Sequence, residues 1–140
     1  SVVDYLRQRS RPYLFSNSIP PMIAASGIAT FDLIAKTNAL QDKLHANTAY
    51  FVQKMKEAGF DIKPTQSAIC AVMLYDAKLS QDVAARLQEE GIYVTGFYYP
   101  VVPKGQARIR VQLSAAHETE HLDKCVAAFT KVGKELGVLK

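Results

Sequence analysis

Residues 68–75 read Ala68-Ile-Cys-Ala-Val-Met-Leu-Tyr75, and no charged side chain interrupts them. A continuous apolar run of strand length is typical of a strand that is covered on both faces. Residues 107–113 (ARIRVQL) alternate instead between apolar and polar side chains, which is typical of a strand with one polar face. Residues 92–98 are interpreted as a third strand. Together these segments predict a small sheet.

Helices are predicted before, between and after these strands. Asn38 is a good cap before the helix at residues 39–58, Gly59 is placed to close that same helix, and Gly91 is placed to close the helix at residues 79–90. The predicted helices are residues 3–10, 22–35, 39–58, 79–90 and 118–136. We expect residues 22–35, which are rich in small apolar side chains, to be largely buried, and residues 13–18 to be extended. The pattern predicts the α+β class, with helices packed on one side of a small, mainly antiparallel sheet.

The composition is that of one globular unit. Of the 140 residues, 49% are apolar and 21% are charged, which suffices to bury a core. No apolar stretch approaches the ~20 residues that cross a bilayer, so we expect no membrane partner. The net charge of +4 is spread among acids, so we expect no nucleic-acid partner. Cys70 and Cys125 lie among apolar neighbours and are interpreted as buried, reduced thiols. Ser1 opens no signal peptide, and we interpret this start as excised.

Arg110 is the first candidate for binding chemistry. It points away from the apolar side of its predicted strand and follows a loop, Tyr99–Gly105, whose prolines restrict the path of the chain. A guanidinium on a rigid strand can receive a carboxylate, because its planar fork donates two parallel hydrogen bonds. The alternative is that Arg108 and Arg110 are two solvent-facing arginines on a half-exposed strand, and the spacing alone favours this alternative.

The segment Tyr13–Ser18 (YLFSNS) is a second candidate. Its hydroxyl and amide groups precede a predicted helix, where they could donate hydrogen bonds to a phosphate. The alternative is that Asn17 or Ser18 caps the helix that starts near Pro20, and capping explains such residues more often than ligand binding does.

The stretch His117-Glu-Thr-Glu-His121 matches the HExxH pattern of zinc proteases. In the predicted last helix, however, both histidines fall on the side opposite the apolar stripe, where a dry metal cavity is not expected. Glu135 is the sole downstream candidate for a third ligand, and His45 stands alone on another helix. We therefore predict no metal site.

Two long ordered segments resemble the α-oxoamine synthases, namely Arg7–Ser18 and Gly91–His117. The second contains the Pro-x-x-Pro-Lys-Gly loop (100–105) and the arginine strand that the members share. At Val94–Tyr99 (VTGFYY) the chain is most similar to the glycine C-acetyltransferase branch, also called 2-amino-3-ketobutyrate CoA ligase. The resemblance implies fold-type-I architecture, with residues 1–140 forming the small C-terminal domain and residues 1–20 the connection from a larger domain that binds pyridoxal 5'-phosphate (PLP).

The resemblance also implies roles for particular residues. Ser16 and Asn17 match the segment that reaches the PLP phosphate across the interface of a homodimer, and Arg110 matches the arginine that binds the amino-acid carboxylate. The family's Schiff-base lysine, ring-stacking histidine and aspartate have no counterpart here and are expected upstream of Ser1, so we place no catalytic residue in this chain and expect the isolated chain to be inactive.

The implied reaction of the complete enzyme is condensation of glycine with acetyl-CoA to 2-amino-3-oxobutyrate and CoA, in threonine degradation. We expect this reaction in the cytoplasm, or in the mitochondrion of a eukaryote. Two alternatives remain: a sibling synthase with another acyl donor, and a non-catalytic α+β interaction module.

Overall fold

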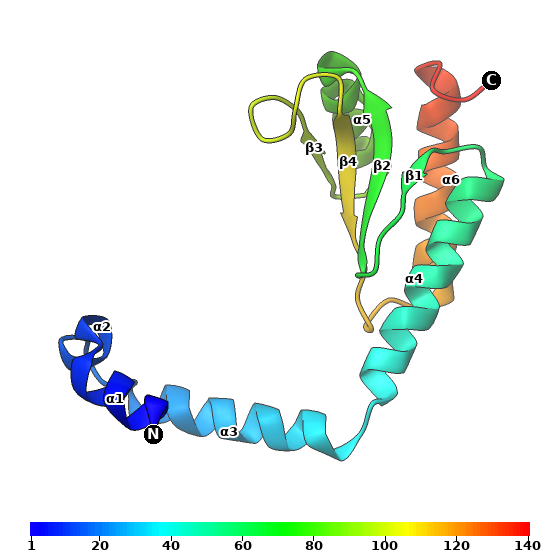
Figure 1. Ribbon diagram of the computed structural model, residues 1–140. Coiled ribbons are helices and arrows are strands. Elements are labelled where there is room, and N and C mark those ends of the chain that lie inside the picture. The colour runs from blue at the N-terminus through cyan, green and yellow to red at the C-terminus, as the bar shows by residue number, and fades with distance from the viewer. The chain divides into compact units, whose positions relative to one another are not determined.

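The computed structural model describes residues 1–140. The chain divides into two compact units, residues 1–38 and residues 39–140 (Figure 1). The assignment of both to a single C-terminal domain stays a prediction.

The first unit is made of helices. They are α1 (Val2–Arg9), α2 (Arg11–Leu14) and α3 (Pro21–Lys36). Ser1 caps α1, since its hydroxyl accepts the backbone N–H of Asp4. The expectation that residues 13–18 are extended is wrong at its start, because a proline at the beginning of α2 is compatible with a helical turn.

Helix α3 is exposed within this chain. None of its residues is buried, and Phe31 leaves 75% of its surface accessible. The expected burial of residues 22–35 is therefore wrong for this chain. The physical reason is that every side chain of the hydrophobic core belongs to residues 39–140, so the apolar surface of α3 has no core of its own unit to join.

The second unit combines three helices with a four-stranded sheet. In chain order the elements are α4 (Ala39–Glu57), β1 (Ile62–Lys63), β2 (Ile69–Tyr75), α5 (Ala77–Glu89), β3 (Thr95–Phe97), β4 (Ala107–Gln112) and α6 (Thr119–Glu135). The strand order is β1-β2-β4-β3, and every neighbouring pair is antiparallel. The α+β prediction is confirmed. Strand β1 was not predicted, and β3 is shorter than predicted.

One face of the sheet carries the core. Cys70 pairs with Val111, and Val72 pairs with Ile109, and all four side chains are buried. Helix α5 lies behind the sheet in Figure 1, while α4 and α6 run side by side. Their buried side chains join the same cluster: Phe51 and Met55 from α4, Val83 and Leu87 from α5, and Leu122, Phe129 and Val132 from α6. The other face of the sheet is thereby left to carry polar side chains.

Strand β2 is covered on both faces only at its centre. Met73 leaves 9% of its surface accessible, although it alternates with the core side chains. Ile69 and Tyr75, at the two ends, are exposed. The two-faced burial expected for residues 68–75 thus holds for the middle of the strand.

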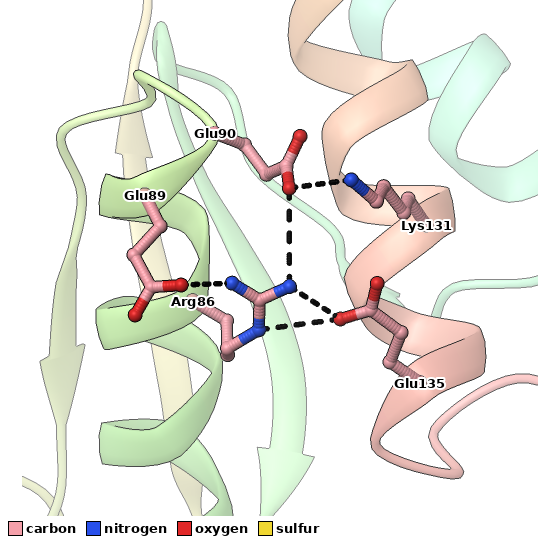
Figure 2. A network of polar contacts seen from close by, with 5 residues as sticks. All are labelled: Arg86, Glu89, Glu90, Lys131 and Glu135. Carbon is pink, nitrogen blue, oxygen red and sulfur yellow. Dashed lines mark hydrogen bonds and ion pairs between the residues drawn. The ribbon is translucent and has the colours of Figure 1, made fainter.

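An ion-pair network joins α5 to α6 (Figure 2). The guanidinium of Arg86 donates to Glu135 through Nε (3.2 Å) and Nη2 (2.7 Å), and it also pairs with Glu89. Lys131 donates to Glu90 at 2.7 Å. The bond to Glu135 raises the pKa of Arg86, and the bond from Lys131 lowers the pKa of Glu90. This network connects α5 and the residue after it to α6 outside the apolar core.

Both cysteines are free thiols, as expected. Cys70 is fully buried and Cys125 is partly buried. Burial raises the pKa of both thiols, that of Cys125 to about 11. None of the helices has the length and apolar character needed to cross a membrane.

Candidate functional site

Arg110 lies on the polar face of the sheet. In β4 the side chains of Ala107, Ile109 and Val111 are buried, while Arg110 is exposed. Its backbone sits between β2 and β3, opposite Ala71 on one side and Thr95 on the other. The alternation therefore places Arg110 as expected, on a central strand that is held by hydrogen bonds from both sides.

The guanidinium of Arg110 is free to take an anion. It forms no ion pair or hydrogen bond within the chain, and its carbon Cζ lies 5.7 Å from the centre of the Phe97 ring. Arg110 lines a hollow of about 320 Å³ together with Tyr93, Thr95 and Gln112. A cation that lies over an aromatic ring is attracted to the ring face. Its N–H groups stay available to donate hydrogen bonds to a ligand. This arrangement suits a carboxylate of a small molecule.

Arg108 differs from Arg110. Its side chain is half-buried, and its Nε is covered without a hydrogen-bond partner. The alternative of two solvent-facing arginines on a half-exposed strand is therefore wrong for Arg108. Spacing could not separate the two residues, because both have the same position in the alternation.

Gly96 sets the distance between β3 and α5. A Cβ at Gly96 would stand 2.8 Å from the backbone oxygen of Ser80, closer than real contacts allow. Glycine therefore lets the backbone of α5 approach the strand that carries Phe97. The position of the Phe97 ring beside Arg110 therefore depends on the close packing of β3 against α5.

The loop between β3 and β4 adds aromatic groups beside this strand. Tyr98, Tyr99 and Lys104 line a hollow of about 330 Å³ together with Tyr75. The Lys104 ammonium lies 5.2 Å from the centre of the Tyr99 ring. Val102 is buried at 9% exposure, which anchors the middle of the loop. The loop is thus a packed element with an exposed aromatic rim.

Ser16 and Asn17 lie in the first unit, between α2 and α3, and are exposed. The capping alternative for Asn17 and Ser18 is wrong, because the residue at the N-cap of α3 is Pro20 and no side chain caps this helix. The hydroxyl of Ser16 and the amide of Asn17 are therefore available to a ligand. Since Arg110 belongs to the second unit, their grouping into one site stays a prediction.

The two histidines of the HExxH stretch are engaged through Nδ1. The backbone N–H of Ser114 donates to Nδ1 of His117 at 3.2 Å, and that of Glu118 donates to Nδ1 of His121 at 3.1 Å. An acceptor Nδ1 carries no proton, so the neutral ring carries its proton on Nε2. Zinc at Nε2 would require moving that proton to Nδ1 and breaking the backbone bond. No group of three metal-binding side chains is found in the chain.

Phe97 and the covered Nε of Arg108 are features that the sequence analysis missed. The alternation of residues 95–97 could have placed Phe97 on the face of Arg110, once the pairing of β3 with β4 was known. No sequence signal marks the buried Nε, because it depends on how neighbouring side chains cover the sheet.

Known proteins are similar to this chain in sequence over nearly its whole length. The family model of aminotransferase class I and II matches residues 1–129. A 2-amino-3-ketobutyrate coenzyme A ligase of Escherichia coli K12 is 54% identical over 99% of this chain and 35% of its own length. The mitochondrial ligase of Mus musculus is 50% identical over 99% of this chain and 33% of its own length.

A solved structure extends the likeness to the fold. A serine palmitoyltransferase variant from S. paucimobilis, with a bound PLP–myriocin aldimine, superposes with a TM-score of 0.87 at 27% identity. The match covers 97% of this chain and 35% of that protein. The chain therefore spans about a third of the length of the proteins that it matches.

Proposed function

Since this chain belongs to the aminotransferase class I and II family, we propose that it is the C-terminal part of a PLP-dependent glycine C-acetyltransferase. The complete enzyme would condense glycine with acetyl-CoA to 2-amino-3-oxobutyrate and CoA, a step of threonine degradation. The similarity to 2-amino-3-ketobutyrate coenzyme A ligases, over nearly the whole of this chain, supports this proposal over the other α-oxoamine synthases.

The exposed guanidinium of Arg110 is the observation that carries the proposal. Glycine has two polar groups by which a protein can bind it, the amine and the carboxylate. Two parallel hydrogen bonds from Arg110 would fix the plane of that carboxylate and hence the direction of the Cα–H bonds. The guanidinium also makes a cation–π contact with the ring of Phe97, with its Cζ 5.7 Å from the ring centre. Arg110 is thus proposed to bind and orient the substrate.

The exposed donors at Ser16 and Asn17 fit the phosphate of PLP. A hydroxyl and an amide both donate hydrogen bonds, and neither has a partner within the chain. PLP, when bound, supplies an electron sink for the charge that develops at the glycine Cα. We propose that Ser16 and Asn17 reach the phosphate in the partner subunit of a homodimer, so that each site needs both subunits.

The remaining catalytic groups are proposed to lie in the rest of the full-length protein. We assign no lysine of this chain to the Schiff base, and the isolated 140-residue chain should therefore show no acetyltransferase activity. The proposed location is the cytoplasm of a bacterium or the mitochondrion of a eukaryote, and the name of the mouse relative supports the second case.

The proposal is tested by assaying CoA thiol release from acetyl-CoA by the full-length protein. Glycine is the expected acceptor, with alanine and serine as matched controls, and acetyl-CoA should be used faster than palmitoyl-CoA. A preference for serine and a long acyl-CoA would instead identify a sibling synthase. If no combination of amino acid and acyl-CoA gives CoA release that depends on the amino acid, the result would favour the non-catalytic interaction module.

A further inference from the structure

A second hollow lies beside the one that contains Arg110. It has a volume of about 440 Å³ and lies between residues 91–94, the end of β4 and the first half of α6. Val111, Leu113 and Leu122 contribute apolar surface to its wall. Pockets for small organic ligands have volumes of roughly 300–1,000 Å³ and combine apolar walls with a few polar groups. The hollow is therefore large enough for a small organic molecule.

The two histidines of this hollow present hydrogen-bond donors. Because backbone N–H groups donate to both Nδ1 atoms, His117 and His121 each carry the proton of the neutral ring on Nε2. Neither Nε2 has a partner within the chain. The centres of the two rings lie 6.4 Å apart, and both residues line the hollow. Because both Nε2 atoms carry protons, the two histidines favour a ligand group that accepts hydrogen bonds.

The side chains that line the hollow include a positive charge. Lys124 is the charged side chain among the lining residues, and no carboxylate lines the hollow. Two acids of the same region are engaged with residues of α4: Glu118 accepts from Lys43, and Asp123 accepts from the hydroxyl of Tyr50. The ligand that best matches two N–H donors and an ammonium is an anion.

We propose that this hollow binds a small organic anion with an apolar body, of the short-chain carboxylate class. The carboxylate accepts from the Nε2–H groups of His117 and His121 and faces the ammonium of Lys124. The hydrocarbon chain packs on Val111 and Leu122. An inorganic anion would leave this apolar wall unused, and a neutral molecule would leave the ammonium unpaired.

The site is distinct from the proposed glycine site but adjoins it. Tyr93, Val94 and Gln112 border both hollows. A carboxylate probe could therefore also bind at Arg110, and the readout has to come from the histidines. The inference does not depend on the proposed glycine C-acetyltransferase activity, and an inactive protein can still be tested.

The test is a titration of the full-length protein, labelled with ¹³C at histidine Cε1, with sodium butyrate. The signals of His117 and His121 are assigned by His117→Gln and His121→Gln. We expect both to shift saturably with butyrate and not with 1-butanol, which has the same chain without the charge. Lys124→Gln should weaken binding on the order of two- to fivefold, as expected for one exposed charge. Lys134→Gln, on an exposed part of α6, is the matched control and should have no effect.

Three outcomes would overturn the inference. One is no saturable shift of either histidine signal, and another is an equal response to 1-butanol. The third is a shift that survives Lys124→Gln unchanged but disappears in Arg110→Gln, since butyrate would then act from the neighbouring hollow. Lys124→Gln removes no hydrogen bond within the chain, and an unchanged far-ultraviolet circular dichroism spectrum verifies its fold.

Discussion

Replacing Arg110 with lysine in the full-length protein tests the role of the guanidinium fork. Arginine can donate two parallel charge-assisted hydrogen bonds to a carboxylate, whereas lysine acts as a point charge and keeps about one. A lost charge-assisted bond costs about 1.5–3 kcal/mol. Arg110 is exposed in this chain, so the lower end of this range applies. Because about 1.4 kcal/mol corresponds to a tenfold change, the glycine KM should rise about tenfold.

The assay is steady-state CoA release at saturating acetyl-CoA with glycine as the varied substrate. The cofactor content of Arg110→Lys should stay near that of the wild type, since Arg110 is assigned to the substrate. Arg9→Lys, at the exposed end of α1, is the matched control and should change the KM by less than about twofold, as most surface substitutions do. A glycine KM in Arg110→Lys within that same twofold range would refute the carboxylate assignment.

Three further variants test other parts of the structure. Ser16→Ala combined with Asn17→Ala should weaken PLP retention, measured as cofactor content after dialysis, because two donors to the phosphate are lost. Gly96→Ala should lower stability by about 1–3 kcal/mol in thermal unfolding, since the new Cβ collides with the backbone of α5. Lys131→Gln should lower the Tm at neutral pH but less at acid pH. The pKa of Glu90 is lowered from 4.5, so the pair stabilises above pH 4.5 and this effect is lost as the pH falls through the lowered value.

Each of these substitutions has a control. Equal cofactor content in dialysed wild type and double variant would remove Ser16 and Asn17 from the phosphate site. Gly27→Ala adds a Cβ with nothing within 4 Å, so a Tm loss equal to that of Gly96→Ala would contradict the packing argument. A Tm difference for Lys131→Gln that stays constant into strong acid would show that the Glu90 carboxylate is not its cause.

The strands illustrate what patterns of side chains can predict. The alternation in residues 107–113 was sufficient to predict β4, its buried face and the exposure of Arg110. Strand β1 has two residues, Ile62 and Lys63, and no pattern of its own; it exists because it pairs with β2. The apolar composition of α3 predicted burial, but composition does not say which surface covers a helix.

The candidate site depended on more than the pattern. Spacing alone favoured a plain surface arginine at position 110, and the resemblance to α-oxoamine synthases reversed that interpretation. The ring of Phe97 and the unpaired state of the guanidinium are tertiary features, which the structure adds. The Nδ1 bonds of His117 and His121 likewise depend on a turn geometry that the HExxH pattern does not encode.

The most direct test of the central claim is a crystal structure of the full-length protein with PLP and glycine bound. The account predicts that both carboxylate oxygens of glycine lie about 2.7–2.9 Å from guanidinium nitrogens of Arg110, the range of charge-assisted bonds. A glycine carboxylate bound by other side chains, with Arg110 out of contact with it, would contradict the account.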